Sequence, residues 1–373
     1  MTNYLNEQPM AMKSFPGLQE TIELEAEQKE EALQITNRLA VEKGQLALYF
    51  QALALVAFED WLKNREPSLS VEKTEASLFN PDYAQAINAV CNLRVGEFKI
   101  CLIPTLGFSD ELVTIPQAVL AVPEFAAHFY LIIGIEDELD LAAIRGVARY
   151  DQLAADIAGI AVQADGSYEL PVTSFSPKIE EVLVYLQCLS PATIKLPAVS
   201  TNRDYLEDLR EFLSQQAVNA GQWIQSKVGE LVQGLDGQLI PAVSPLRQRQ
   251  PATMVDINDI LDDRNIEVPP EARVRFQDLN LAGKQLHLFT FVWPLATENE
   301  WCLLLILTAP PEEKLPPGVR LRVTDFQEVI VEEQLQNDYI LTQIEGNHHE
   351  KFLVTIITAD GEEKKTILFE FRP

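Results

Sequence analysis

The stretch QLALYFQALALVAFEDWL, residues 45–62, limits the fold more than any other part of the chain. Between Leu46 and Phe58 its only polar side chain is Gln51, apart from the hydroxyl group of Tyr49. A helix that is apolar on every side must be buried. This one is too short to cross a bilayer, which takes about 20 apolar residues. The stretch therefore predicts the central helix of a water-soluble domain.

The residues before this stretch extend the helical pattern. Four apolar residues recur every seventh position and form one stripe, at Ala32, Leu39, Leu46 and Leu53. This spacing predicts a helix over residues 27–64. Gly44 interrupts it, and either kinks the helix or separates two helices.

A β region is predicted over about residues 88–150. Gly96 and Glu97 form a two-residue hairpin turn, and pairing outward from it sets Cys91 opposite Leu102. Because successive side chains alternate between faces, Cys91 and Cys101 then point to opposite sides and form no disulfide. Free buried thiols are typical of a reducing cytoplasm.

The remaining patterns divide the chain into two domains. Helices over 177–189 and 203–235 complete an N-terminal domain, residues 1–240, that mixes helices with an antiparallel sheet. Residues 241–270 contain five prolines among polar residues and predict a linker. Residues 271–373 contain seven or eight strand-like runs, typical of an immunoglobulin-like β-sandwich. The predicted fold class is therefore α+β.

Composition excludes several classes of partner. The 373 residues include 56 acidic and 29 basic ones, which gives a net charge of −27. Nucleic-acid affinity depends on Lys and Arg that neutralise phosphates, and anionic lipids likewise attract basic segments. We therefore expect no direct binding of nucleic acid. No signal peptide or transmembrane segment is visible, so we expect a cytoplasmic protein without membrane insertion.

No motif predicts a cofactor, a catalytic group or a metal site. The phosphate-binding and dinucleotide-binding glycine patterns are absent, as is the G-x-S-x-G turn of hydrolases. His348 and His349 lie beside Glu345 and Glu350, but adjacent side chains on an extended segment point apart. Asp256 to Glu267 resembles a calcium loop, yet Leu261 occupies the sixth position, where the sharp turn needs glycine. We interpret it as a solvated acidic linker.

One short segment of the linker is a candidate partner-binding site. Four of its apolar residues have helical spacing: Met254, Ile257, Ile260 and Leu261. One or two amphipathic turns of this kind dock in the groove of another domain or protein.

Three blocks of sequence resemble a cyanobacterial family of uncharacterised proteins, described as a domain of unknown function. The first block runs from the apolar helix through AVCNLRVGEFKICLIP to VTIPQAV. Within it, the residues that resemble a hairpin pattern of the family are Leu93, Val95, Cys101, Pro104 and Pro116. The second block is NAGQWIQ from Asn219, and the third is LPPGVRLRVTD from Leu315. Gly107-Phe-Ser-Asp departs from the family's usual loop after the hairpin. The resemblance implies an organisation and a cyanobacterial cytoplasm, and it implies no activity.

These observations lead to a first expectation and two alternatives. We expect a non-enzymatic interaction or adaptor protein that binds a protein partner. The first alternative is a hydrolase or small-ligand-binding enzyme with a site between the N-terminal helix and sheet, lined by Gln51, Tyr49, Arg94 or Cys101. The second is autoinhibition, in which residues 254–261 occupy a groove of the N-terminal domain until a partner displaces them.

Overall fold

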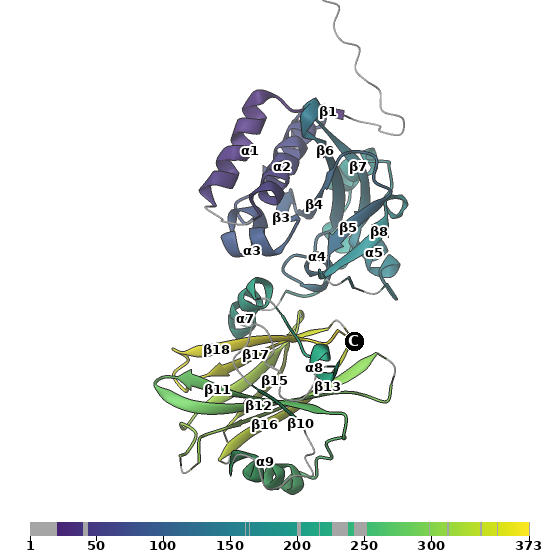
Figure 1. Ribbon diagram of the computed structural model, residues 1–373. Coiled ribbons are helices and arrows are strands. Elements are labelled where there is room, and N and C mark those ends of the chain that lie inside the picture. The colour runs from purple at the N-terminus through teal and green to yellow at the C-terminus, as the bar shows by residue number, and fades with distance from the viewer. Residues whose placement is uncertain are drawn as a thin grey trace, which may run out of the picture. The chain divides into compact units, whose positions relative to one another are not determined.

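The computed structural model describes residues 21–39, 44–160, 162–163, 165–199, 203–215, 217–225, 238–241, 252–297, 299–311, 313–335, 338–348 and 350–372. The chain has a mixed α+β fold and divides into two compact units, Met1–Ala198 and Val199–Pro373 (Figure 1). This boundary precedes the linker predicted at 241–270. Each unit has its own hydrophobic core.

The first unit is built on a six-stranded sheet in the order β1-β7-β6-β4-β3-β2. Its strands are β1 (Thr21–Glu23), β2 (Val71–Glu72), β3 (Val90–Val95), β4 (Phe98–Leu106), β6 (Phe129–Glu136) and β7 (Leu141–Arg149). The prediction of an antiparallel sheet is wrong at one place, because β4 and β6 are parallel. The crossover between them contains β5 (Leu112–Pro116), which pairs with β8 (Ser167–Pro171), and α4 (Ala118–Ala121).

Helices cover one face of this sheet. α2 (Gln45–Arg65) packs against the face that carries Ile100, Leu102 and Leu131, and α1 (Ala26–Arg38) packs against α2 (Figure 1). The smaller helices are α3 (Pro81–Ala86), α5 (Tyr150–Asp156) and α6 (Glu180–Cys188). The apolar stretch that predicted a central helix is thus buried in α2, from Gln51 to Phe58.

Gly44 separates the two predicted halves of the first helix. Its φ of 80° lies in the left-handed region, which glycine adopts without steric cost. α2 begins at the next residue, so the seven-residue stripe does not continue on one face. Leu53 is fully buried, whereas Leu46 is 66% exposed.

A bulge in β3 alters the predicted hairpin. The turn at Gly96 sets Val95 opposite Phe98 and Leu93 opposite Ile100, as predicted, but the register then shifts between Leu93 and Val90. One extra residue therefore faces β4, and Asn92 adopts a φ of 58°. The prediction that the two thiols lie on opposite faces is wrong: the Sγ atoms of Cys91 and Cys101 are 3.6 Å apart.

The second unit contains two five-stranded sheets that share one core. The first sheet has the order β10-β11-β12-β13-β16, and the second has the order β15-β14-β17-β18-β9. Their strands are β9 (Val218–Asn219), β10 (Gln238–Pro241), β11 (Arg273–Leu281), β12 (Lys284–Pro294), β13 (Glu300–Thr308), β14 (Arg320–Thr324), β15 (Val329–Gln334), β16 (Tyr339–Asn347), β17 (Lys351–Ile357) and β18 (Lys364–Glu370).

The unit boundary lies before the linker because one helix belongs to the second unit. The helix predicted over 203–235 is interrupted in the structure: α7 (Arg203–Ser214) is followed by β9, which pairs with β18, and by α8 (Gly221–Gln225). Residues 226–235 lie outside the described residues. α7 packs Phe212 against Leu353 and Leu368. Its Asp208 binds Arg322 of β14 through two hydrogen bonds of 2.6 and 2.8 Å.

The predicted linker also contains regular structure. β10 pairs with β11, and residues 252–263 form α9 (Ala252–Asp263). A helix spans Asp256 to Asp262, so these acids lie on helical turns rather than in a calcium-type loop. Residues 242–251 of the linker lie outside the described residues.

Candidate functional site

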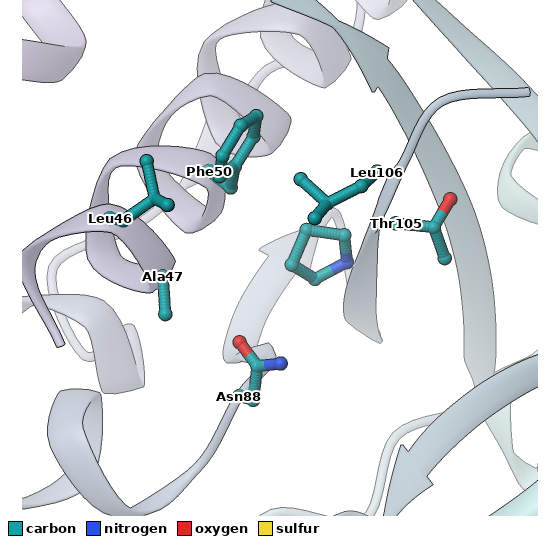
Figure 2. Close-up of a pocket in the computed structure, with 7 residues that line it drawn as sticks. Leu46, Ala47, Phe50, Asn88, Thr105 and Leu106 are labelled. Carbon is teal, nitrogen blue, oxygen red and sulfur yellow. The ribbon is translucent and has the colours of Figure 1, made fainter.

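An apolar pocket opens in the first unit between the start of α2 and the end of β4. Its volume is about 170 Å³. Figure 2 shows Leu46, Ala47 and Phe50 on the helix, Thr105 and Leu106 on the strand, and Asn88 below them. Pro104 completes the lining. Leu46 and Leu106 are 66% and 62% exposed, so the pocket is rimmed by two accessible leucines.

Local backbone geometry places both leucines at the opening. Gly44 ends the preceding segment in the left-handed conformation, so Leu46 lies in the first turn of α2, before the helix becomes buried. Leu106 is the last residue of β4, and Gly107 then turns the chain away with a φ of 73°. Among the described residues, no other segment covers either leucine side chain.

The residues that the enzyme hypothesis placed in such a site do not line it. Gln51 is buried and its Nε2 donates a hydrogen bond to the Ala84 carbonyl at 3.3 Å. The Tyr49 hydroxyl donates to Asp137 at 3.4 Å. Arg94 is exposed on the outer part of β3. The hypothesis placed an enzyme site between the helix and the sheet, and its residues did not include Pro104, Thr105 or Leu106.

Cys101 lies on the face of the sheet opposite α2. It contacts Cys91, and burial raises the pKa of the Cys101 thiol well above its ordinary value. Only a thiolate is an effective nucleophile, so this thiol is unreactive near neutral pH. On the same face Tyr130 donates a hydrogen bond to the Val119 carbonyl at 2.8 Å, and burial likewise raises its pKa.

His128 is held neutral at the edge of this region. The backbone N–H of Lys99 donates to its Nδ1 at 2.8 Å, and the side chain is only 8% exposed. Burial, together with the positive charges of Lys99 and Arg94, lowers the pKa of His128 from 6.5 to about 4. A group with this pKa is only a weak general base near pH 7 and carries no proton to donate as an acid, and its Nδ1 already accepts a hydrogen bond.

The lowered pKa predicts that the first unit loses stability in acid. Between pH 6.5 and about 4 the unfolded state binds a proton at His128 that the folded state does not. Stability from this group is thus complete above pH 6.5 and is lost as the pH falls through this window. The loss amounts to about 3 kcal/mol for a shift of this size.

A His128→Asn variant provides the comparison, because asparagine still accepts the Lys99 N–H bond but does not titrate. Hydrogen exchange of residues 98–106, followed by mass spectrometry, measures the opening free energy at pH 7 and at pH 4.5. We expect wild type to lose about 2 kcal/mol more than the variant between these two pH values. Equal losses in both proteins would show that His128 is already free to protonate in the fold.

The predicted partner-binding residues pack within their own unit. Ile257 and Leu261 of α9 are buried against the outer face of the sheet that contains β11, β12 and β13, and Ile260 is partly buried beside them. Met254 lies in the first half of α9, and its side chain is outside the described part of the structure. Any partner that uses this segment must first displace it from that sheet.

Of the two histidines considered for a metal site, the structure describes His348. His348 stacks on Phe371 with ring centroids 5.2 Å apart. The carboxylate of Glu350 accepts the backbone N–H of Asn347 at 2.8 Å. His349 lies outside the described residues. Where the structure is described, no three His, Cys, Asp or Glu side chains gather in a way that suits a metal ion.

Comparison with known proteins gives a family without an activity. The model that matches residues 22–368 is described as a protein of unknown function (DUF1822). No curated protein and no solved structure matches the chain. The described helices include none with the length and apolar character needed to cross a membrane.

Proposed function

The chain belongs to the DUF1822 family, whose description assigns no activity, and we propose that it is a non-enzymatic protein that binds an apolar side chain of a partner protein in the pocket between α2 and β4. The observation that carries this proposal is the pair of exposed leucines, Leu46 and Leu106, at the pocket mouth. Exposed apolar surface around a cavity is typical of an interaction site.

The size of the pocket supports a side chain rather than a whole ligand. Sites for drug-sized ligands have volumes of about 300–1,000 Å³, whereas a cavity of about 150 Å³ holds a benzene-sized group. At about 170 Å³ the pocket takes one leucine or phenylalanine side chain. Such an anchor in a central pocket is how a small interface gains most of its affinity.

Replacing Leu106 by arginine tests this function. The change puts a charge at the pocket mouth, and binding of a leucine-sized anchor is expected to fall about tenfold or more. Peptides of 12 residues are selected by phage display on the immobilised full-length protein, and their affinities are measured by fluorescence polarisation.

Val184→Arg is the matched control, because Val184 is 57% exposed on α6 and does not line the pocket. Peptides that bind the control like wild type but fail on Leu106→Arg support the proposal. Selected peptides that bind all three proteins equally contradict it.

Binding of a small apolar ligand is a second candidate for the same pocket. It is favoured by the location, since the pocket lies between the N-terminal helix and the sheet, where an enzyme site was expected. The lining residues are apolar except for Asn88 and Thr105, and no acid, histidine or thiol is among them. The lining therefore suits binding better than hydrolysis. Displacement of the selected peptides by benzene-sized compounds distinguishes this case.

Three finer features remain proposals. An immunoglobulin-like class for the second unit is supported by two sheets around one core, although the strand order differs from the ABED and CFG sheets of that fold. A cytoplasmic location is supported by the buried free thiols of Cys91, Cys101 and Cys302. A cyanobacterial source is implied by the sequence resemblance alone.

A further inference from the structure

An acidic turn borders the apolar pocket. The segment that joins β6 to β7, Glu136–Asp140, carries four carboxylates in five residues. A Cβ atom placed on Gly107, the residue after Leu106, would lie 3.3 Å from the Glu136 carboxylate. The turn also reaches the helix side of the pocket, because Tyr49 donates to Asp137 and its ring lies 5.8 Å from that of Phe50.

The cations described near this turn leave it negative. Lys29 forms ion pairs with Asp137 at 2.9 Å and with Asp140. It forms no ion pair with Glu136 or Glu138, so Lys29 does not neutralise these two carboxylates directly. Arg145 donates to the Thr105 hydroxyl at 3.2 Å and to the Asp110 carbonyl. The carboxylate of Asp110 lies near Arg145 and offsets part of its charge.

We propose that the occupant of the pocket is a basic segment of a partner protein, with a leucine-sized side chain flanked by lysine or arginine. The inference rests on the proposed function, because the apolar side chain is held by that same pocket. The flanking cations face Glu136 and Glu138, while an acidic segment with the same anchor is repelled. Complementary charges at the rim of an interface mainly decide which partner binds.

Three phage-displayed libraries of 12-residue peptides test the proposal. The first fixes a central leucine flanked by two lysines, the second replaces the lysines by glutamates, and the third replaces the leucine by serine. Each is selected on the full-length protein, on the Glu136→Lys, Glu138→Lys double variant and on Leu106→Arg. A Glu180→Lys, Glu181→Lys double variant on α6 makes the same change in net charge away from the pocket, and thermal unfolding verifies that every variant is folded.

On wild type and on the α6 control, the basic leucine library is expected to yield about tenfold more binders than the acidic one, since each exposed ion pair contributes modestly. The Glu136→Lys, Glu138→Lys variant is expected to invert this ratio. Equal yields of basic and acidic binders that all depend on Leu106 would overturn the inference and leave the proposed function standing. Binders that do not depend on Leu106 or on the fixed leucine would overturn both.

Discussion

Replacing Asp208 by alanine is expected to destabilise the second unit by about 3–5 kcal/mol, because it leaves the buried charge of Arg322 with only the partly exposed Asp204 and Glu332 as partners. Arg322 is fully buried and Asp208 is 1% exposed. Two hydrogen bonds join the two side chains, and the Thr324 hydroxyl donates a further one to Asp208 at 2.8 Å. The pair also attaches α7 to β14, so its loss releases the helix from the sheet.

Urea unfolding followed by tryptophan fluorescence measures this effect. A Trp61→Phe background removes the one tryptophan of the first unit, and Trp223, Trp293 and Trp301 then report on the second. Asp204→Ala is the control, because Asp204 contacts the same arginine at 3.2 Å but is 49% exposed. It is expected to cost less than about 1 kcal/mol. A loss for Asp208→Ala no larger than for Asp204→Ala would mean that the pair does not hold α7.

Replacing Leu53 by alanine is expected to destabilise the first unit by about 2–5 kcal/mol, whereas Leu46→Ala on the same helix changes stability by about 0.5 kcal/mol or less. The two substitutions remove the same atoms. They differ because Leu53 is fully buried in the core and Leu46 is 66% exposed at the pocket. Leu46→Ala should nevertheless weaken peptide binding, since it removes part of the pocket wall.

Native-state hydrogen exchange of residues 45–65, read by mass spectrometry, measures the opening free energy of α2 in each variant. Peptide affinity is measured on the same samples. If both substitutions cost the same stability, then Leu46 is covered in solution and the pocket is not accessible.

Much of the local structure could be predicted because it depends on short-range patterns. The apolar run predicted a buried helix, and α2 occupies residues 45–65. The Gly96 turn predicted the inner register of the hairpin. The alternating runs after residue 271 predicted strands, and the described residues of that stretch form β11 to β18. Each of these rests on neighbours within a few residues.

The failures have a different physical origin. The bulge that brings Cys91 to 3.6 Å from Cys101 interrupts the strand alternation at one position, and Asn92, a residue type that tolerates positive φ, is only a weak signal of it. The early end of α7 depends on β9 pairing with β18, about 150 residues later in the chain. The alternating run QLHLFTFVW does not reveal that His287 is buried and contacts Asp278 of the neighbouring strand at 3.1 Å.

The candidate site shows the same division. The helix side of the pocket lies in the stretch that first defined the fold, and Gly44 marked where that stretch begins. The strand side is the end of β4, and the parallel pairing of that strand with β6 was not predicted. Leu106 is an apolar residue before a turn glycine, a weak signal that many strands share.

The sequence by itself determined which segments are buried, which positions turn, and how strongly acidic the chain is, because these follow from the side chains and their spacing. Only the tertiary structure decided that Leu46 and Leu106, 60 positions apart, form one pocket, and that an acidic turn borders it. Contacts between distant segments depend on strand order and packing, and local periodicity carries no information about either.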